Sequence, residues 1–148
     1  MAQDRPAALV TGSASGIGRA AALRLAQAGY DVVINYSRSS DAAAKTLAEL
    51  EQLGGRHLAV RADVSDDDEV AGLVSAAGEA FGRLDALVNS AGVTSPTPPD
   101  DLDGVDLADW DRVFAVNVRG LFQVTRACAP LLKSAGGSVV TWAGTTTG

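Results

Sequence analysis

Apolar and polar positions alternate along the chain in blocks that predict strands and helices in turn. Short apolar runs, of the kind found in buried parallel strands, recur five times. Between them lie stretches in which apolar residues return every three or four positions, the period of a helix. The predicted strands are residues 7–11, 31–36, 57–62, 84–89 and 138–143.

Four helices are predicted between these strands. The first covers about 16–28, the second begins at Ser39, Ser40 or Asp41, the third begins with Ser65 as its cap, and the fourth covers about 107–133. Strict alternation of strand and helix implies an α/β fold with a parallel sheet and right-handed crossovers. We therefore predict a doubly wound, three-layer α/β/α domain with strand order 3-2-1-4-5.

Three glycines join the first strand to the first helix. Gly12 would let the chain turn sharply, Gly16 would let a ligand approach the backbone, and Gly18 would let the helix pack closely on the strand. The N–H groups at the start of such a helix favour an anion such as a pyrophosphate. The stretch is therefore interpreted as a dinucleotide site, with a glycine-rich turn without ligand as the alternative. The apolar face of the helix is predicted at Ile17, Ala21, Leu25 and Ala28.

A second glycine-containing turn, Asn89-Ser90-Ala91-Gly92, follows the fourth strand. In a doubly wound sheet the carboxyl ends of strands one and four meet at the ligand-binding crevice. Both turns are thus expected at one site. The proline-rich loop 92–106 that follows is long for a compact domain, which favours a functional role.

Composition narrows the possible functions. With 148 residues the chain suits one domain, and its net charge of −6 argues against binding nucleic acid. Cys128 is interpreted as a packed core thiol and His57 as an ordinary strand residue, and no metal-ligand spacing is present. No signal peptide and no apolar run long enough to cross a membrane is found, so a cytoplasmic protein is expected.

These motifs resemble those of the short-chain dehydrogenase/reductase family. The segment from Thr11 to Gly18 is similar to its cofactor signature, and the turn after the fourth strand to its Asn-Asn-Ala-Gly motif. Asp63-Val64 resembles the pair that contacts adenine, and Asn117 the helix-four asparagine of the catalytic tetrad. The resemblance implies a Rossmann-like fold, with residues 1–148 as a single NAD(P)-binding domain of an alcohol dehydrogenase or carbonyl reductase. It also implies a homo-oligomer formed through the fourth helix.

The resemblance implies the following cofactor-binding residues: Gly12, Ser15, Gly16, Ile17, Gly18, Asn35, Tyr36, Ser37, Arg38, Asp63, Val64, Asn89, Ala91 and Gly92. Asn117 is assigned to a catalytic proton relay. Its alternative reading is a buried amide satisfied by a neighbouring carbonyl.

The predicted cofactor is NADP, with NAD as the alternative. Domains that prefer NAD carry an acid about 20 residues past the glycines. Here the second strand ends in Asn35-Tyr36-Ser37-Arg38 without an acid, and Arg38 is available for a 2′-phosphate. Ser15, in contrast, lacks the positive charge of many relatives that use NADP.

The chain also departs from the family. The catalytic Tyr-x-x-x-Lys is absent, and the position of the catalytic serine is taken by Thr145, or by Gly144 if the register slips by one residue. We therefore expect a cofactor-binding part that lacks the family's last strands and is inactive alone, with residues 138–143 forming a buried strand that another chain or segment covers. The alternatives are a non-catalytic dinucleotide-binding module or pseudoenzyme, and a subunit completed by another chain.

Overall fold

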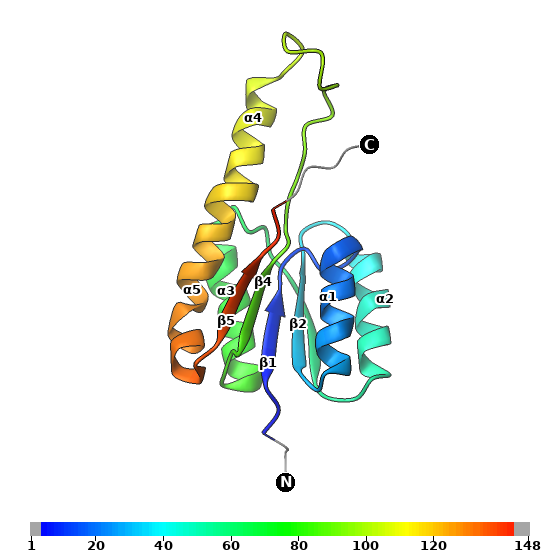
Figure 1. Ribbon diagram of the computed structural model, residues 1–148, viewed down its shortest axis with the longest axis vertical. Helices are drawn as coiled ribbons and strands as arrows, with labels where there is room; N and C mark the ends of the chain where they lie inside the picture. The colour runs from blue at the N-terminus through cyan, green and yellow to red at the C-terminus, as the bar shows by residue number, and fades with distance from the viewer. Residues whose placement is uncertain (1–3, 144–148) are drawn as a thin grey trace.

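The computed structural model describes residues 4–143, which are built around a parallel sheet (Figure 1). The strand order is β3-β2-β1-β4-β5, as predicted. All four strand pairs within the sheet are parallel, so their carboxyl ends lie along one edge. The strands are β1 (Ala7–Val10), β2 (Asp31–Tyr36), β3 (His57–Arg61), β4 (Ala86–Asn89) and β5 (Ser138–Thr141).

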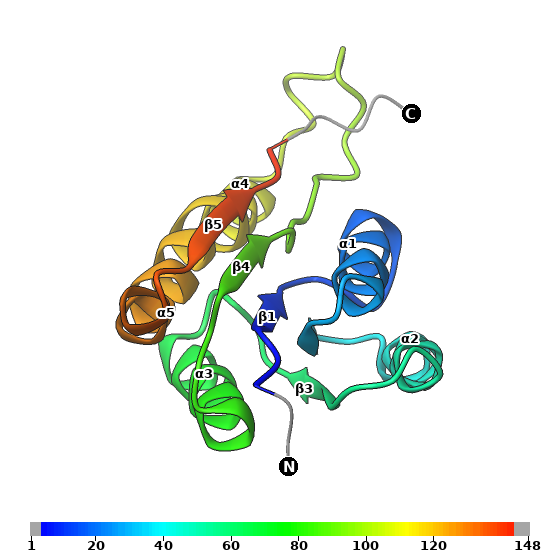
Figure 2. The ribbon, with the colours of Figure 1, turned by 60° about the horizontal axis from the view of Figure 1, so that its bottom comes forward.

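Helices cover both faces of the sheet, which confirms the three-layer arrangement. Figure 2 shows α1 and α2 against one face and α3 and α5 against the other. The helical segments are α1 (Gly16–Gln27), α2 (Ser40–Glu51), α3 (Asp67–Phe81), α4 (Leu107–Phe114), η1 (Ala115–Gly120) and α5 (Leu121–Ala135).

The core consists of two apolar layers, one on each side of the sheet. Successive residues of a strand point to opposite faces, so Leu9 joins the layer under α3 and α5 while Val10 joins the layer under α1 and α2. The central strand β1 is wholly buried. Burial of one such aliphatic side chain stabilises the fold by roughly 1.5–3 kcal/mol. The near-continuous apolar strands are thus explained by helices on both faces.

One local prediction for the helices is partly right and another is wrong. Of the predicted apolar face of α1, Ala21 and Leu25 pack against the core, whereas Ile17 is 50% exposed and Ala28 is exposed. The fully buried residues of α1 are Gly18, Ala22 and Ala26, and Gly18 packs against the turn that precedes the helix. The cap of α3 is Asp66, whose carboxylate accepts hydrogen bonds from the N–H groups of Asp68 and Glu69. Ser65 instead donates its hydroxyl to Asp63 at the end of β3.

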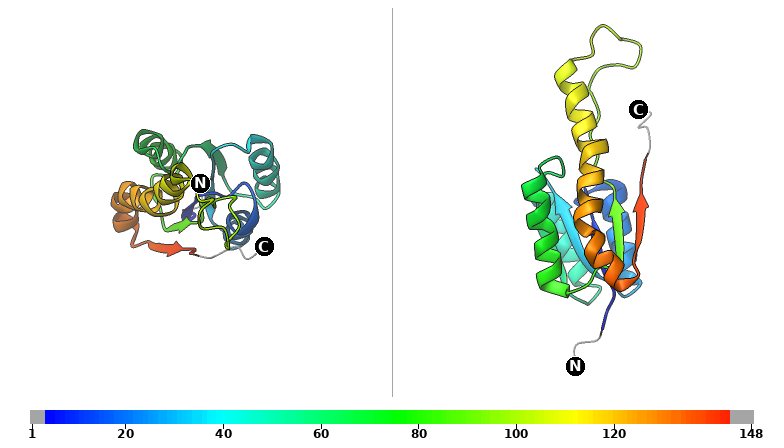
Figure 3. Two further views of the ribbon diagram at one scale, coloured as in Figure 1. Left: turned by 90° about the horizontal axis from the view of Figure 1, so that it is seen from above. Right: turned by 90° about the vertical axis from the view of Figure 1, so that its left-hand side faces the viewer.

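The long fourth helix was predicted with nearly the right ends, but its middle is not α-helical. Segments α4, η1 and α5 form one rod, in which η1 is a π-helical turn (Figure 3). The apolar residues along this rod divide between two environments. Cys128 and Leu132 are buried in the core, while Trp110 and Phe114 are about half exposed, because α4 extends beyond the edge of the sheet (Figure 1).

Strand β5 was predicted to have the pattern of a buried strand that another chain or segment covers, and within residues 4–143 all four of its residues are exposed. It pairs with β4 in register, Leu87 beside Val139, but has no second neighbour among the described strands. Val140 and Trp142 are 59% and 57% exposed. The apolar composition of this strand therefore marks an uncovered sheet edge in residues 4–143.

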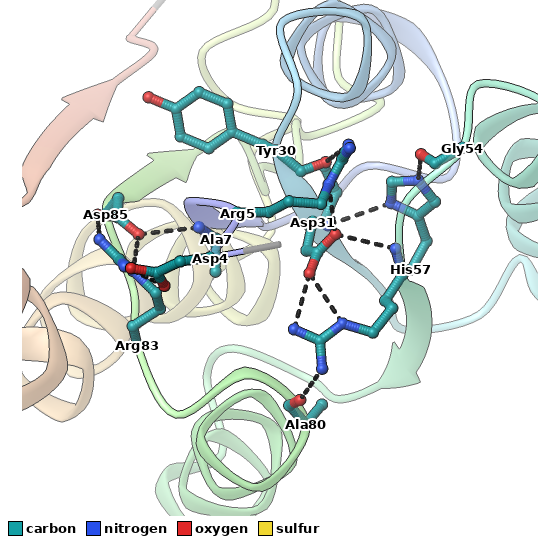
Figure 4. A network of polar contacts seen from close by, with 12 residues as sticks. Asp4, Arg5, Ala7, Tyr30, Asp31, Gly54, His57, Ala80, Arg83 and Asp85 are labelled. Carbon is teal, nitrogen blue, oxygen red and sulfur yellow. Dashed lines mark hydrogen bonds and ion pairs between the residues drawn. The ribbon is translucent and has the colours of Figure 1, made fainter. Parts of the chain in front are cut away.

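At the amino-terminal ends of the strands, the buried carboxylate of Asp31 is held by two arginines (Figure 4). Arg5 Nε donates to its Oδ1 at 3.0 Å, and Arg56 donates its backbone N–H to Oδ1 and its guanidinium to Oδ2. The same guanidinium reaches the carbonyl of Ala80 at the end of α3. These contacts tie the N-terminal segment, β2, β3 and α3 together, at the end of the sheet away from the candidate site.

Candidate functional site

A large hollow lies at the carboxyl ends of β1 and β4, where the strand order reverses. It is a cavity of about 670 Å³, open to solvent, with a volume suited to a cofactor-sized ligand. Among the residues predicted to bind the cofactor or act in catalysis, the following line it: Gly12, Ser15, Gly16, Ile17, Gly18, Asn35, Tyr36, Ser37, Arg38, Gly92 and Asn117.

The glycine turn has the geometry expected of an anion-binding loop. Gly12 and Gly16 have φ angles of +58° and +59°, which side chains rarely adopt. A Cβ on Gly18 would lie 2.3 Å from the carbonyl oxygen of Gly12, whereas at Gly16 no atom lies within 4 Å. Ser15, at the start of α1, makes no side-chain cap. The start of the helix therefore has no side-chain cap, and the space beside Gly16 is open.

Thr11 links the two turns of the site, a role that the sequence analysis missed. Its hydroxyl oxygen accepts hydrogen bonds from the N–H groups of Ser90 and Ala91, each at 3.1 Å. A Cβ on Gly12 would lie 2.7 Å from Cα of Ala91. The turn after β4 therefore packs directly against the glycine turn and is hydrogen-bonded to it. A threonine one residue before the first glycine was the available signal, but its partners lie about 80 residues away.

Asn35 lines the cavity, yet its side chain is committed to the protein backbone. Its Oδ1 accepts from the N–H of Gly12 at 3.2 Å, and its Nδ2 donates to the carbonyls of Val60 and Ala62. Only 2% of the residue is exposed. Asn35 thus ties the glycine turn to β2 and β3. Its contact with a cofactor stays a prediction.

A second, smaller cavity of about 90 Å³ opens beside the first and contains the predicted Asp63, Val64 and Ala91. The Asp63 carboxylate is held by Ser65 and by Arg112 of α4. Burial by itself would raise the pKa of Asp63, but the hydrogen bonds from Ser65 and Arg112 outweigh it and hold the pKa below its usual value. Asp63 is therefore ionised at neutral pH and offers hydrogen-bond acceptors to this cavity.

The Asn117 amide brackets the backbone of Val93. Its Oδ1 accepts from the Val93 N–H at 2.8 Å and its Nδ2 donates to the Val93 carbonyl at 2.9 Å. This is the satisfied amide that the alternative reading describes. Asn117 lies in the π-helical turn η1, and its two bonds to Val93 hold the start of the loop after β4 against this turn. The proton-relay role of Asn117 stays a prediction, and Thr145 and Gly144 lie outside the described residues.

Asn89 and Cys128 lie beneath the site, in the core. Asn89 donates from Nδ2 to the hydroxyl of Thr125, while its buried Oδ1 has no partner within residues 4–143. Burial raises the pKa of the Cys128 thiol to about 12, so the thiol stays protonated at neutral pH and unreactive. The interpretation of Cys128 as a core thiol is confirmed.

Positive charge at the cavity comes from Arg38, at the end of β2. Its exposed side chain makes no ion pair or hydrogen bond within the part of the chain that the structure describes. Arg19, on the first helix, is instead paired with Glu49. Arg38 is therefore the cation available to an anionic ligand beside Ser37.

In residues 4–143 there is no cluster of His, Cys, Asp and Glu residues suited to a metal ion, and no helix long and apolar enough to span a membrane.

Comparison with known proteins finds a matching family model and several similar proteins. A family model described as short chain dehydrogenase matches residues 6–147. A ketoacyl reductase of the granaticin polyketide synthase from Streptomyces violaceoruber is 46% identical over 140 residues, covering 94% of this chain and 55% of the relative. A 3-oxoacyl-(acyl-carrier-protein) reductase from Synechocystis sp. is 43% identical over 134 residues, covering 90% and 53%.

Solved structures agree with this similarity. A short chain dehydrogenase from Burkholderia cenocepacia, solved in complex with NADP, superposes with a TM-score of 0.85 at 42% identity. The match covers 94% of this chain and 55% of that one. The chain spans about half the length of the curated relatives it matches.

Proposed function

The chain belongs to the short-chain dehydrogenase family, and on this basis we propose that residues 1–148 form a single domain that binds NADP(H). It would serve a cytoplasmic oxidoreductase that transfers hydride between the cofactor and a carbonyl or alcohol. The observation that carries the proposal is the cavity where the glycine turn, Arg38 and Asn117 meet at the reversal of strand order. The names of the reductase relatives support a carbonyl as the substrate group.

The glycine turn would hold the pyrophosphate of the cofactor. The start of α1 has no side-chain cap, the space beside Gly16 is open, and the helix dipole favours an anion there. Asn35 accepts a hydrogen bond from the Gly12 N–H, and the Thr11 hydroxyl accepts one from the Ala91 N–H, so the turn is fixed by protein contacts. A preorganised turn loses little entropy when the ligand binds, so these contacts favour affinity.

Arg38 would distinguish NADP from NAD. Its guanidinium is free of protein partners in the described residues and lines the same cavity as Ser37 and Ser39. A guanidinium matches a phosphate group in charge and in hydrogen-bond geometry. The solved relative in complex with NADP supports this assignment.

Replacing Arg38 with glutamine is expected to weaken NADPH binding about tenfold, the effect of one charge-assisted hydrogen bond to phosphate. Binding of NADH, which lacks the 2′-phosphate, should change less than about twofold. Isothermal titration of both cofactors against the purified chain measures the difference. Arg24→Gln is the matched control, because Arg24 lies on the exposed end of α1 and contacts Gln27.

Two results would contradict this assignment. Tighter binding of NADH than of NADPH by the unsubstituted chain would exclude NADP as the preferred cofactor. A Gly16→Val chain that bound NADPH as well as the unsubstituted chain would exclude the glycine turn as the pyrophosphate site, because the side chain would occupy the open space above Gly16.

We further propose that the long helix forms a homo-oligomer, as the family resemblance implies. Trp110, Phe114, Val118 and Phe122, spaced four residues apart, are each about half exposed. The rings of Trp110 and Phe114 stack with centroids 5.2 Å apart. A continuous apolar stripe of this kind on a surface helix typically marks an interaction site. Its position along one rod suits antiparallel packing against the same helix of a second copy.

Replacing Phe114 with aspartate is expected to convert this dimer into a monomer, because the charge would be desolvated at the centre of the contact. Sedimentation velocity at micromolar concentration measures the change. Ser75→Asp, on the exposed surface of α3, is a control that should leave the oligomeric state unaltered. An unsubstituted chain that sediments as a monomer would contradict the proposal.

A further inference from the structure

Arg112 of α4 reaches back to the end of β3 and holds the Asp63 carboxylate. Its NH1 lies 3.0 Å from Oδ2 of Asp63 and 3.1 Å from the hydroxyl oxygen of Ser65. Ser65 in turn donates to Oδ1 of Asp63 from its backbone N–H, at 3.0 Å, and from its hydroxyl, at 2.6 Å. The orientation of the carboxylate is therefore set at both oxygens, from two different elements.

The carboxylate held in this way stands at the wall of the smaller cavity. That cavity adjoins the glycine turn and has an otherwise mainly apolar lining: Ala62, Val64, Ala91, Val93 and Val116. Apolar walls with one well-placed acceptor suit a flat aromatic ring that carries a hydrogen-bond donor. A carboxylate offers about four acceptor sites. Ser65 and Arg112 use three of them, which leaves one for a ligand.

The family resemblance implies that Asp63 contacts the adenine end of the dinucleotide. We propose that Arg112 is a positioning residue for that contact, holding the Asp63 carboxylate so that its free acceptor site takes a hydrogen bond from the amino group of the base. The inference rests on the proposed function and extends it to base selectivity. Helix α4 has no buried residue, so its contacts with the rest of the domain are few. The ion pair of Arg112 with Asp63 therefore also links the smaller cavity to α4.

Selectivity for the base distinguishes this role from a merely structural one. The probe pair is NADPH and reduced nicotinamide hypoxanthine dinucleotide phosphate, in which a carbonyl oxygen replaces the adenine amino group. The unsubstituted chain is expected to bind NADPH about tenfold more tightly, since the analogue would place a second acceptor against the carboxylate. In Arg112→Gln this ratio is expected to fall below about two, mainly through weaker binding of NADPH. Arg112→Lys keeps the charge and should restore most of the ratio.

A matched control lies on the same rod. Arg126 of α5 pairs with Asp67 at 2.9 Å on the surface, so Arg126→Gln removes a comparable ion pair away from the cavity and should leave the ratio unchanged. Asp63→Asn replaces one acceptor of the carboxylate with a donor and should also abolish the preference for adenine. Circular dichroism confirms that each variant is folded.

The outcomes separate this inference from the function on which it rests. Failure of the unsubstituted chain to bind either dinucleotide would contradict the proposed function. Equal binding of the two dinucleotides by that chain would overturn only the role of Asp63 and Arg112. Equal loss of affinity for both in Arg112→Gln would show that Arg112 supports the fold and does not select the base.

Discussion

Replacing Asp31 with alanine is expected to lower the free energy of unfolding by about 3 kcal/mol, the cost of removing one partner from a buried ion pair. Its carboxylate is fully buried and accepts hydrogen bonds from Arg5 and from both the backbone and the guanidinium of Arg56 (Figure 4). Without it, the Arg56 N–H loses its acceptor and two guanidinium groups lose their counter-charge. Urea denaturation of the two chains measures the difference.

The same substitution should leave dinucleotide affinity nearly unchanged, because Asp31 is the first residue of β2, whereas the cavity lies at the carboxyl ends of the strands. Asp67→Ala is the matched control. Its ion pair with Arg126 is exposed on both sides, so a loss below about 1 kcal/mol is expected. A loss for Asp31→Ala no larger than that of the control would contradict the view that this network holds the N-terminal segment on the sheet.

Replacing Gly18 with alanine is expected to cost about 2–3 kcal/mol and to weaken NADPH binding at least about tenfold, as overpacking at a preorganised site does. A Cβ at this position would lie 2.3 Å from the Gly12 carbonyl oxygen and 2.9 Å from Cα of Ser13. Both are backbone atoms, so the overlap is relieved only if α1 or the glycine turn moves. Denaturation and calorimetric titration of one preparation measure both effects.

Gly72 provides the control for helix propensity. It lies within α3, and a Cβ there would meet no atom within 4 Å. Gly72→Ala should therefore stabilise the chain by up to about 1 kcal/mol, as expected for alanine in an exposed helix interior. If Gly18→Ala behaved in the same way, the close packing of α1 on the glycine turn would not hold.

Much of the fold could be predicted from the sequence because its signals are local. Apolar runs and helical periods depend on neighbouring residues, so the order and type of the strands and helices followed directly. Strict alternation then implied the parallel sheet, and the sheet placed the turns after Val10 and Asn89 at one edge. Gly12 and Gly16 were assigned for conformational reasons, and both adopt positive φ.

Many of the residues chosen for the candidate site line one cavity, but their contacts could not be predicted from the sequence. Asn35 and Asn117 were chosen from motif positions, and the structure shows their amides bound to the backbone of other elements. Arg112 carried no local signal, and the position of Thr11 before the first glycine did not reveal its partners. The groups that these two residues hold lie 49 residues away for Arg112 and 79 or 80 residues away for Thr11. Such contacts exist only after the sheet has formed.

The sequence by itself determined the elements, their order and the edge of the sheet at which the candidate site lies, because backbone conformation and burial periodicity depend on short stretches of sequence. Tertiary packing decided which face of α1 is most deeply buried and where the long helix becomes π-helical, at η1. It also brought Asp31 between Arg5 and Arg56, and Asp63 beside Arg112. These features depend on the distance between groups far apart in sequence, which no local pattern encodes.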